Sequence, residues 1–200
     1  MGREAALWAA GFRLVAGVDE AGRGPLAGPV VAGAVILPRD FSHPRLDDSK
    51  RMSLKAREEL AGLISERARA WAVAWTDPAE VDAINIHQAS LLAMRRAVQG
   101  LGARPDYALV DGRFTPDWDL ACEAQVGGDG RTRCIAAASV LAKVHRDRLM
   151  CTFHQRYPVY NFAANKGYPT AEHREALARY GPCPIHRQSY RPVAQRAFLF

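Results

Sequence analysis

The sequence lacks the features that would place it in a membrane, in a disulfide-stabilised scaffold or around a zinc ion. No run of about 18 apolar residues could span a bilayer, and the first residues lack the order of a signal peptide. The four cysteines form no Cys-x-x-Cys pair, so we expect buried free thiols rather than a zinc site or disulfides. These absences favour a soluble intracellular protein located in the cytoplasm.

Acidic side chains are scarce in the last third of the chain. Residues 1–129 hold 15 basic and 18 acidic side chains, whereas residues 130–200 hold 12 basic and 3 acidic ones. A basic region attracts phosphates, and acids elsewhere can hold the cations that act on them, which favours a polyanion such as nucleic acid as the partner. The alternative is that the basic region is only a solvated surface.

No internal repeat, low-complexity tract or Gly/Ser linker divides the 200 residues, a length that suits one domain with a substantial core. The order of apolar patterns predicts an α/β fold, with a mixed β-sheet flanked by helices and a helical C-terminal part. Expected strands lie at 14–20, 29–37, 71–75, 107–111 and 121–126, and expected helices at 54–70, 77–100, 135–157 and 170–180. We expect loops at 38–47 and 158–169, an α/β core at about 13–157 and a helical extension at about 158–200.

Two sets of side chains are expected to be buried. In the helix at 77–100 the inward residues are Val81, Ile84, Leu91, Met94 and Val98. We also expect three tryptophans to lie in the core rather than to act as stacking platforms for bases: Trp71, Trp75 and Trp118.

Four carboxylates stand where strands end or glycines turn the chain: Asp19, Glu20, Asp111 and Asp129. Acids at the end of a buried strand are costly unless they are paired or bind a metal, although they can also be solvated turn residues. Strand ends can converge at one edge of a sheet, and ligand sets made only of oxygen suit Mg²⁺ or Mn²⁺. Two such ions about 4 Å apart can orient a water and stabilise the leaving oxygen of a phosphodiester.

Seven short segments occur in an order that is specific to one family: VDEAGRGP at 18–25, DSK at 48–50, NI at 85–86, VDG at 110–112, AASVLAKV at 137–144, KGYPT at 166–170 and IHR at 185–187. With them the chain resembles the bacterial ribonucleases HII, the type 2 ribonucleases H, over about residues 13–193. The resemblance implies a ribonuclease H-like fold and Mn²⁺- or Mg²⁺-dependent cleavage of RNA in RNA–DNA hybrids. It also implies cutting on the 5′ side of a ribonucleotide, including one embedded in duplex DNA, with 3′-hydroxyl and 5′-phosphate ends, by a monomeric enzyme.

The resemblance also assigns roles to single residues. Asp19, Glu20, Asp111 and Asp129 match the family's metal-binding and catalytic acids. Gly22, Arg23 and Gly24 match the turn that reads the 2′-hydroxyl and the RNA–DNA junction, and Tyr168 matches the tyrosine that packs on the deoxyribose there.

One position departs from the family pattern. Members commonly have a lysine two residues before the fourth acid, where this chain has Gly127. Asp147 therefore competes with Asp129 for that role, although we interpret Asp147 as a structural partner of Arg146 or Arg148. A binding module with a degenerate site is the alternative that this departure suggests, and the related ribonuclease HIII is a third reading that the early position of Asp19 disfavours.

Other residues have two readings each. Five of them could contact phosphates or could be surface or packing residues: Lys50, Lys143, Lys166, His186 and Arg187. Ser139 could contact the substrate or could pack the helix onto the sheet. The tail at 195–200, a glutamine followed by apolar and aromatic residues, resembles short segments that bind sliding clamps, and the alternative is that it docks on its own protein.

Overall fold

The computed structural model describes residues 2–46 and 52–195 and contains one mixed sheet. The strands are β1 (Val15–Ala21), β2 (Val30–Ile36), β3 (Ala70–Thr76), β4 (Tyr107–Asp111) and β5 (Cys122–Gln125). Their order across the sheet is β3-β2-β1-β4-β5, with β1 antiparallel to β2 and parallel to β4. The predicted α/β class with a mixed sheet is confirmed.

The long helices are α2 (Leu54–Arg67), α3 (Pro78–Gln99), α4 (Arg133–Arg156) and α6 (Ala171–Tyr180). Capping explains where three of them begin. The Ser53 hydroxyl accepts a hydrogen bond from the Ala56 amide at 3.3 Å, and Asp77 forms a capping box with Glu80. Thr170 caps α6 in the same way through its hydroxyl. These four helices begin and end within three residues of the predicted bounds.

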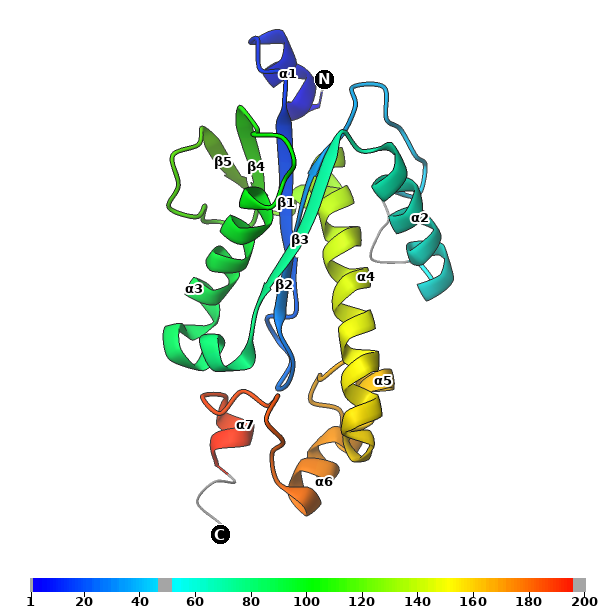
Figure 1. Ribbon diagram of the computed structural model, residues 1–200, viewed down its shortest axis with the longest axis vertical. Helices are drawn as coiled ribbons and strands as arrows, with labels where there is room; N and C mark the ends of the chain where they lie inside the picture. Colours follow the sequence, from blue (N-terminus) through cyan, green and yellow to red (C-terminus); the bar gives the residue numbers. More distant parts are fainter. Residues whose placement is uncertain (1, 47–51, 196–200) are drawn as a thin grey trace.

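Two apolar layers lie on opposite faces of the sheet. Figure 1 shows α3 on one side of the sheet and α4 and α2 on the other. Val18 and Val110 point into the layer under α3, whereas Val15 and Leu109 point toward α4. Helix α4 lies very close to β1, because a Cβ at Gly17 would stand 2.1 Å from the carbonyl carbon of Cys134. Small residues thus bring the start of α4 against the strand that carries the first acids.

A short N-terminal helix, α1 (Arg3–Ala9), was not expected from the sequence. Its buried Glu4 accepts hydrogen bonds from the amides of Arg133 and Cys134, at 3.2 and 3.3 Å. A carboxylate at this position stabilises the start of α4, whose first amides have no partner within the helix. The helix therefore holds in place the N-terminal end of the element that faces the acids.

The C-terminal part returns to the segment that follows β1. It contains the short elements η3 (Pro158–Tyr160), α5 (Phe162–Asn165) and α7 (Arg191–Ala194), so the prediction of an unbroken loop at 158–169 was wrong. The Leu26 amide donates to the Gly167 carbonyl at 2.8 Å, and the Gly28 amide donates to the Ile185 carbonyl at 2.9 Å. The chain after β1 is thus held by residues far away in the sequence.

Some burial predictions were wrong. Trp71 and Trp75 are 37% and 50% exposed, because β3 is an edge strand and their side chains line an open groove beside α4. Ile84 is 36% exposed, because Asn85 interrupts α3 with φ 66° and ψ 162°, and residues before and after that break do not share one face. Trp118 packs against the layer under α3, as expected. No helix among the described residues is both long and apolar enough to cross a membrane.

Candidate active site

The strand register brings two of the predicted acids together. In the parallel pair β1 and β4, Val18 lies opposite Val110, so the next residues along each strand are Asp19 and Asp111. Neighbouring residues on paired strands point to the same face, and here that face is the one covered by α4. The sequence prediction that separate strand ends would converge at one edge of the sheet is confirmed for this pair.

Asp19 lies in a crowded and buried environment. Its carboxylate accepts a hydrogen bond from the Glu20 amide at 2.7 Å and another from the Ser139 hydroxyl. Burial raises the pKa of Asp19 well above its usual range, and the neighbouring charges of Glu20 and Asp111 raise it further, while the two hydrogen bonds oppose the shift. A cation placed here would relieve the repulsion between these acids.

Glu20, near the end of β1, has one carboxylate oxygen that is hydrogen-bonded and one that has no hydrogen-bond partner among the described residues. Its Oε1 accepts from Arg23 Nη1 at 3.2 Å. Its Oε2 is buried and has no hydrogen-bond partner among the described residues. Burial raises the pKa of Glu20, Arg23 opposes that shift, and the charge of Asp111 adds to it. A buried carboxylate oxygen without a partner is costly, and a hard cation is the ligand that suits it.

The loop that carries Asp129 closes against Asp111. The Asp111 carboxylate accepts hydrogen bonds from the amides of Gly128 and Asp129, at 2.7 and 3.4 Å. Asp129 is only 7% exposed and sits in the 3₁₀ turn η2 (Gly128–Gly130), which Gly127 enters in a left-handed conformation. Backbone contacts therefore bring the fourth acid next to the third.

Within the described residues, no three carboxylate, imidazole or thiol groups stand close enough to form a metal-binding group in their present positions. The donor set nevertheless fits Mg²⁺ or Mn²⁺, because it consists of carboxylates and includes the unpartnered oxygen of Glu20. Asp147, the competing acid, forms an ion pair instead. Its carboxylate accepts from Lys143 Nζ at 2.7 Å, so its structural partner is Lys143 and not the arginines that we expected.

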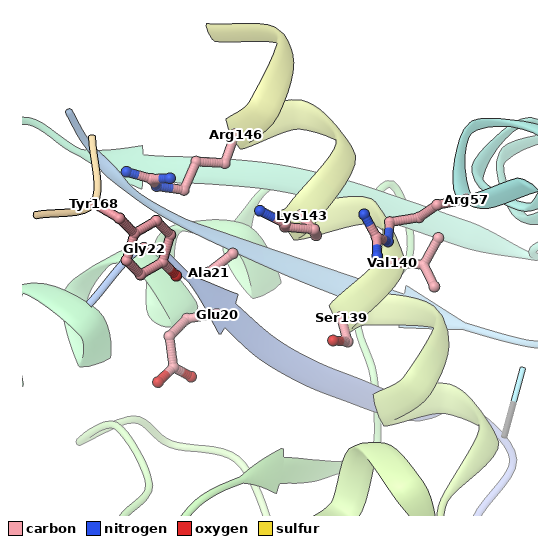
Figure 2. A pocket seen from close by; sticks show the side chains of 9 residues that line it. All are labelled: Glu20, Ala21, Gly22, Arg57, Ser139, Val140, Lys143, Arg146 and Tyr168. Carbon is pink, nitrogen blue, oxygen red and sulfur yellow. The ribbon is translucent and has the colours of Figure 1, made fainter. Parts of the chain in front are cut away.

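A pocket of 320 Å³ opens beside these acids. It is lined by Glu20, Ala21, Gly22, Arg57, Ser139, Val140, Lys143, Arg146 and Tyr168. Figure 2 shows Ser139, Lys143 and Arg146 along α4, with Glu20 at the end of β1. Both arginines that line the pocket, Arg57 and Arg146, were missed as site residues from the sequence. Arg57 lies on a predicted surface helix, where an arginine is an ordinary residue. The one sequence feature that pointed to a functional role was its position seven residues after the DSK segment.

The Gly-Arg-Gly turn reaches the pocket through Gly22, which is one of its lining residues. Gly22 has φ 103°, and a Cβ there would stand 2.0 Å from Arg146 Nε, so only glycine fits. A Cβ at Gly24 would be 3.6 Å from the ring of Tyr168. Tyr168 is 44% exposed, and its backbone carbonyl oxygen lies 2.9 Å from Nδ1 of the buried His173. The structure therefore places the exposed tyrosine directly beside the turn.

Of the other residues that were predicted to contact the substrate, some line the pocket and some do not. Lys143 and Ser139 line the pocket, and Lys50 lies outside the described residues. The Lys166 ammonium donates to the Ala163 carbonyl and to Cys151 Sγ, and is not among the lining residues. His186 and Arg187 are 1% and 0% exposed, so their reading as phosphate contacts was wrong and the packing alternative holds.

Comparisons with known proteins agree with this geometry. A family model described as Ribonuclease HII matches residues 16–193. The chain is 53% identical over 180 residues to the ribonuclease HII of Idiomarina loihiensis, covering 90% of this chain and 96% of that one. The crystal structure of the ribonuclease H2 from Pyrococcus horikoshii OT3 superposes with a TM-score of 0.77 at 26% identity, covering 92% of this chain and 96% of that one. A structure of the PCNA:RNase HII complex from Archaeoglobus fulgidus superposes with a TM-score of 0.73 at 26% identity, covering 89% and 95%.

Proposed function

Because the chain belongs to the ribonuclease HII family, we propose that it hydrolyses the phosphodiester bond on the 5′ side of a ribonucleotide paired with DNA. The coarser activity follows from the family itself: the chain is a ribonuclease H, an endoribonuclease that acts on RNA–DNA hybrids. The proposal extends this activity to a single ribonucleotide embedded in duplex DNA and to products with 3′-hydroxyl and 5′-phosphate ends.

The observation that carries the proposal is the crowding of buried acids at the ends of β1 and β4. Asp19, Glu20, Asp111 and Asp129 would hold two divalent cations, Mn²⁺ or Mg²⁺, and the unpartnered Oε2 of Glu20 supports this assignment. Two ions bound there would supply an activated water and neutralise charge at the scissile phosphate. The activated water makes a histidine base unnecessary.

The protein groups around the acids have separate tasks. Ser139 orients the Asp19 carboxylate through its hydroxyl, and the amides of η2 orient Asp111. The half-buried ammonium of Lys143, held by Asp147, gives the pocket a positive charge that attracts the phosphate backbone.

The turn at 22–24 and the ring of Tyr168 would read the sugar. A 2′-hydroxyl both donates and accepts hydrogen bonds, and glycines let backbone groups approach it closely. The tyrosine ring would pack on the next sugar, which carries no 2′-hydroxyl, and would disfavour a ribose there by contact and desolvation. The adjacency of Gly24 and the Tyr168 ring supports this division of tasks.

The test is cleavage of a labelled RNA–DNA hybrid with Mn²⁺, Mg²⁺ or a chelator, by the protein and by its Asp111→Asn variant. The proposal expects metal-dependent cutting of the RNA strand by the unchanged protein alone, with 3′ ends that a polymerase extends and 5′ ends that a phosphatase modifies. Binding without cutting in either metal would favour the degenerate binding module, and restoring lysine at Gly127 would then be the next variant.

A second proposal concerns the tail. We propose that residues 195–200 bind a sliding clamp, because their sequence resembles clamp-binding segments and a structural relative from Archaeoglobus fulgidus is known in complex with PCNA. All but Gln195 lie outside the described residues. Deleting the six residues should abolish retention on an immobilised clamp, and unchanged retention would rule the idea out.

A further inference from the structure

Two arginines lie buried beneath the Gly-Arg-Gly turn. Arg146 and Arg187 are 1% and 0% exposed, and neither forms an ion pair with a carboxylate in the part of the chain that the structure describes. Burial lowers the pKa of both guanidinium groups, that of Arg146 to about 10. Charges are rarely kept in such positions, because removing them from water is costly unless their donors are satisfied.

Backbone carbonyls satisfy these donors. Arg187 donates to the carbonyl oxygens of Gly22 (2.6 Å), Arg23 (2.9 Å), Pro25 (2.9 Å) and Gly28 (2.8 Å). Arg146 donates to those of Pro29 (3.0 Å), Ala27 (3.2 Å) and Lys166 (3.0 Å). The two guanidinium groups thus hold six of the eight carbonyl groups from 22 to 29.

The direction of these carbonyls determines the direction of the neighbouring amides. In a trans peptide the C=O and the following N–H point in opposite directions. Because the carbonyls of Gly22 and Arg23 point inward to Arg187, the amides of Arg23 and Gly24 point outward. Arg23 and Gly24 are exposed, and neither amide donates a hydrogen bond within the described residues. Two amide donors are therefore presented beside the Tyr168 ring, which lies 3.6 Å from where a Gly24 Cβ would be.

We propose that Arg187 is a positioning residue for ribonucleotide recognition: by holding the carbonyls of Gly22 and Arg23 inward, it aims the amides of Arg23 and Gly24 at the 2′-oxygen. Arg146 supports the same segment from its other end. Arg187 itself is buried and acts only through the turn. The inference rests on the proposed function, because it assigns a cause to the selectivity that this function requires.

The test is a comparison of two affinities in the non-cutting Asp111→Asn background. Fluorescence anisotropy measures the Kd for a DNA duplex with one ribonucleotide and for the same duplex made only of DNA, and the ratio of the two is the ribonucleotide preference. Arg187→Met removes the donors, and Arg187→Lys keeps the charge but cannot reach all four carbonyls. Arg191→Met removes an equal charge from the exposed surface four residues further on and is the matched control.

We expect Arg187→Met to lower the preference roughly tenfold, the effect of losing a well-placed hydrogen bond, and Arg187→Lys to lower it partly. Arg191→Met should keep the preference. Thermal midpoints identify variants that fail to fold. In that case Tyr190→Phe replaces them, because the Tyr190 hydroxyl accepts from Arg187 at 2.9 Å and donates to the Arg23 carbonyl at 2.6 Å, and its loss should lower the preference about twofold.

The outcomes separate the inference from the proposed function. If the Asp111→Asn parent shows no ribonucleotide preference, the proposed reading of the junction is wrong and the inference falls with it. If the parent shows a preference that the folded Arg187 variants retain while both affinities fall equally, Arg187 is only structural and the inference alone is overturned.

Discussion

Replacing Asp19 with asparagine should abolish cleavage and yet stabilise the metal-free protein. The carboxylate is buried, and the charges of Glu20 and Asp111 act on it, so its ionised form is disfavoured in the folded state. Asparagine has nearly the same shape, and its oxygen can still accept from the Glu20 amide and the Ser139 hydroxyl. The substitution therefore removes repulsion without opening a cavity.

The size of the effect follows from the strand spacing. Side chains on paired strands are about 5 Å apart, and two unit charges at that distance repel by about 3 kcal/mol at an effective dielectric constant of about 20. Loss of the charge-assisted hydrogen bonds offsets about 1 to 2 kcal/mol of this. A net gain of about 1 to 2 kcal/mol raises the midpoint of a protein this size by roughly 3 to 6 °C.

The stability difference between Asp19→Asn and the unchanged protein depends on pH. Because the pKa of Asp19 is raised by folding, the folded protein holds this proton more tightly than the unfolded chain does. Stability is therefore lost as pH rises above the unfolded pKa of about 4 and the group ionises. The advantage of Asp19→Asn should be present at neutral pH and should shrink as the pH falls toward that value.

Differential scanning fluorimetry with a chelator measures the two midpoints, and Asp119→Asn, the same change on the exposed surface, is the control. Saturating Mn²⁺ should narrow or reverse the difference, because binding stabilises only the protein with the complete site. A lower midpoint for Asp19→Asn than for the unchanged protein, without metal at neutral pH, would show that repulsion among these acids does not destabilise the folded state.

Three further predictions follow. Glu4→Gln should lower the free energy of unfolding by about 1 kcal/mol in urea titrations while leaving kcat/KM unchanged, because it weakens the cap of α4 and the ion pair with Arg133, neither of which lines the pocket. The pH of half-maximal cleavage should fall as the Mn²⁺ concentration rises, because protons and cations compete for Asp19 and Glu20, whose pKa values are raised. A pH of half-maximal cleavage that stays constant would contradict this. Tyr168→Ala should lower kcat/KM for a single embedded ribonucleotide more than for a long hybrid, whereas equal losses would remove its role at the junction.

Much of the fold could be predicted because its signals are local. The four long helices have capping residues at their starts or clear apolar periodicity, and β1, β2 and β4 are continuous apolar runs. The break at Asn85 left only a weak signal: asparagine tolerates a positive φ, but the apolar residues on both sides of it keep a helical spacing. The exposure of Trp71 and Trp75 depends on β3 being at the sheet edge, which a single sequence does not reveal.

The candidate site was predictable to the extent that it depends on strand ends. The sequence placed Asp19 and Asp111 at or near the ends of two apolar strands, whereas the parallel pairing of these two strands was visible only in the structure. The burial of Arg187 could not be predicted, because its partners are backbone carbonyls, which every residue has and which no side-chain pattern marks. The pairing of Asp147 with Lys143 likewise depends on which face of α4 the two residues share.

The most direct test of the central claim uses a labelled DNA duplex with one ribonucleotide, incubated with Mn²⁺ and the protein or its Asp111→Asn variant. We expect one cut, immediately 5′ to the ribonucleotide, made by the unchanged protein and absent with the variant. A cut at another position, or the same cut by the variant, would contradict the claim that these acids and the turn at 22–24 act together on the bond before a ribonucleotide.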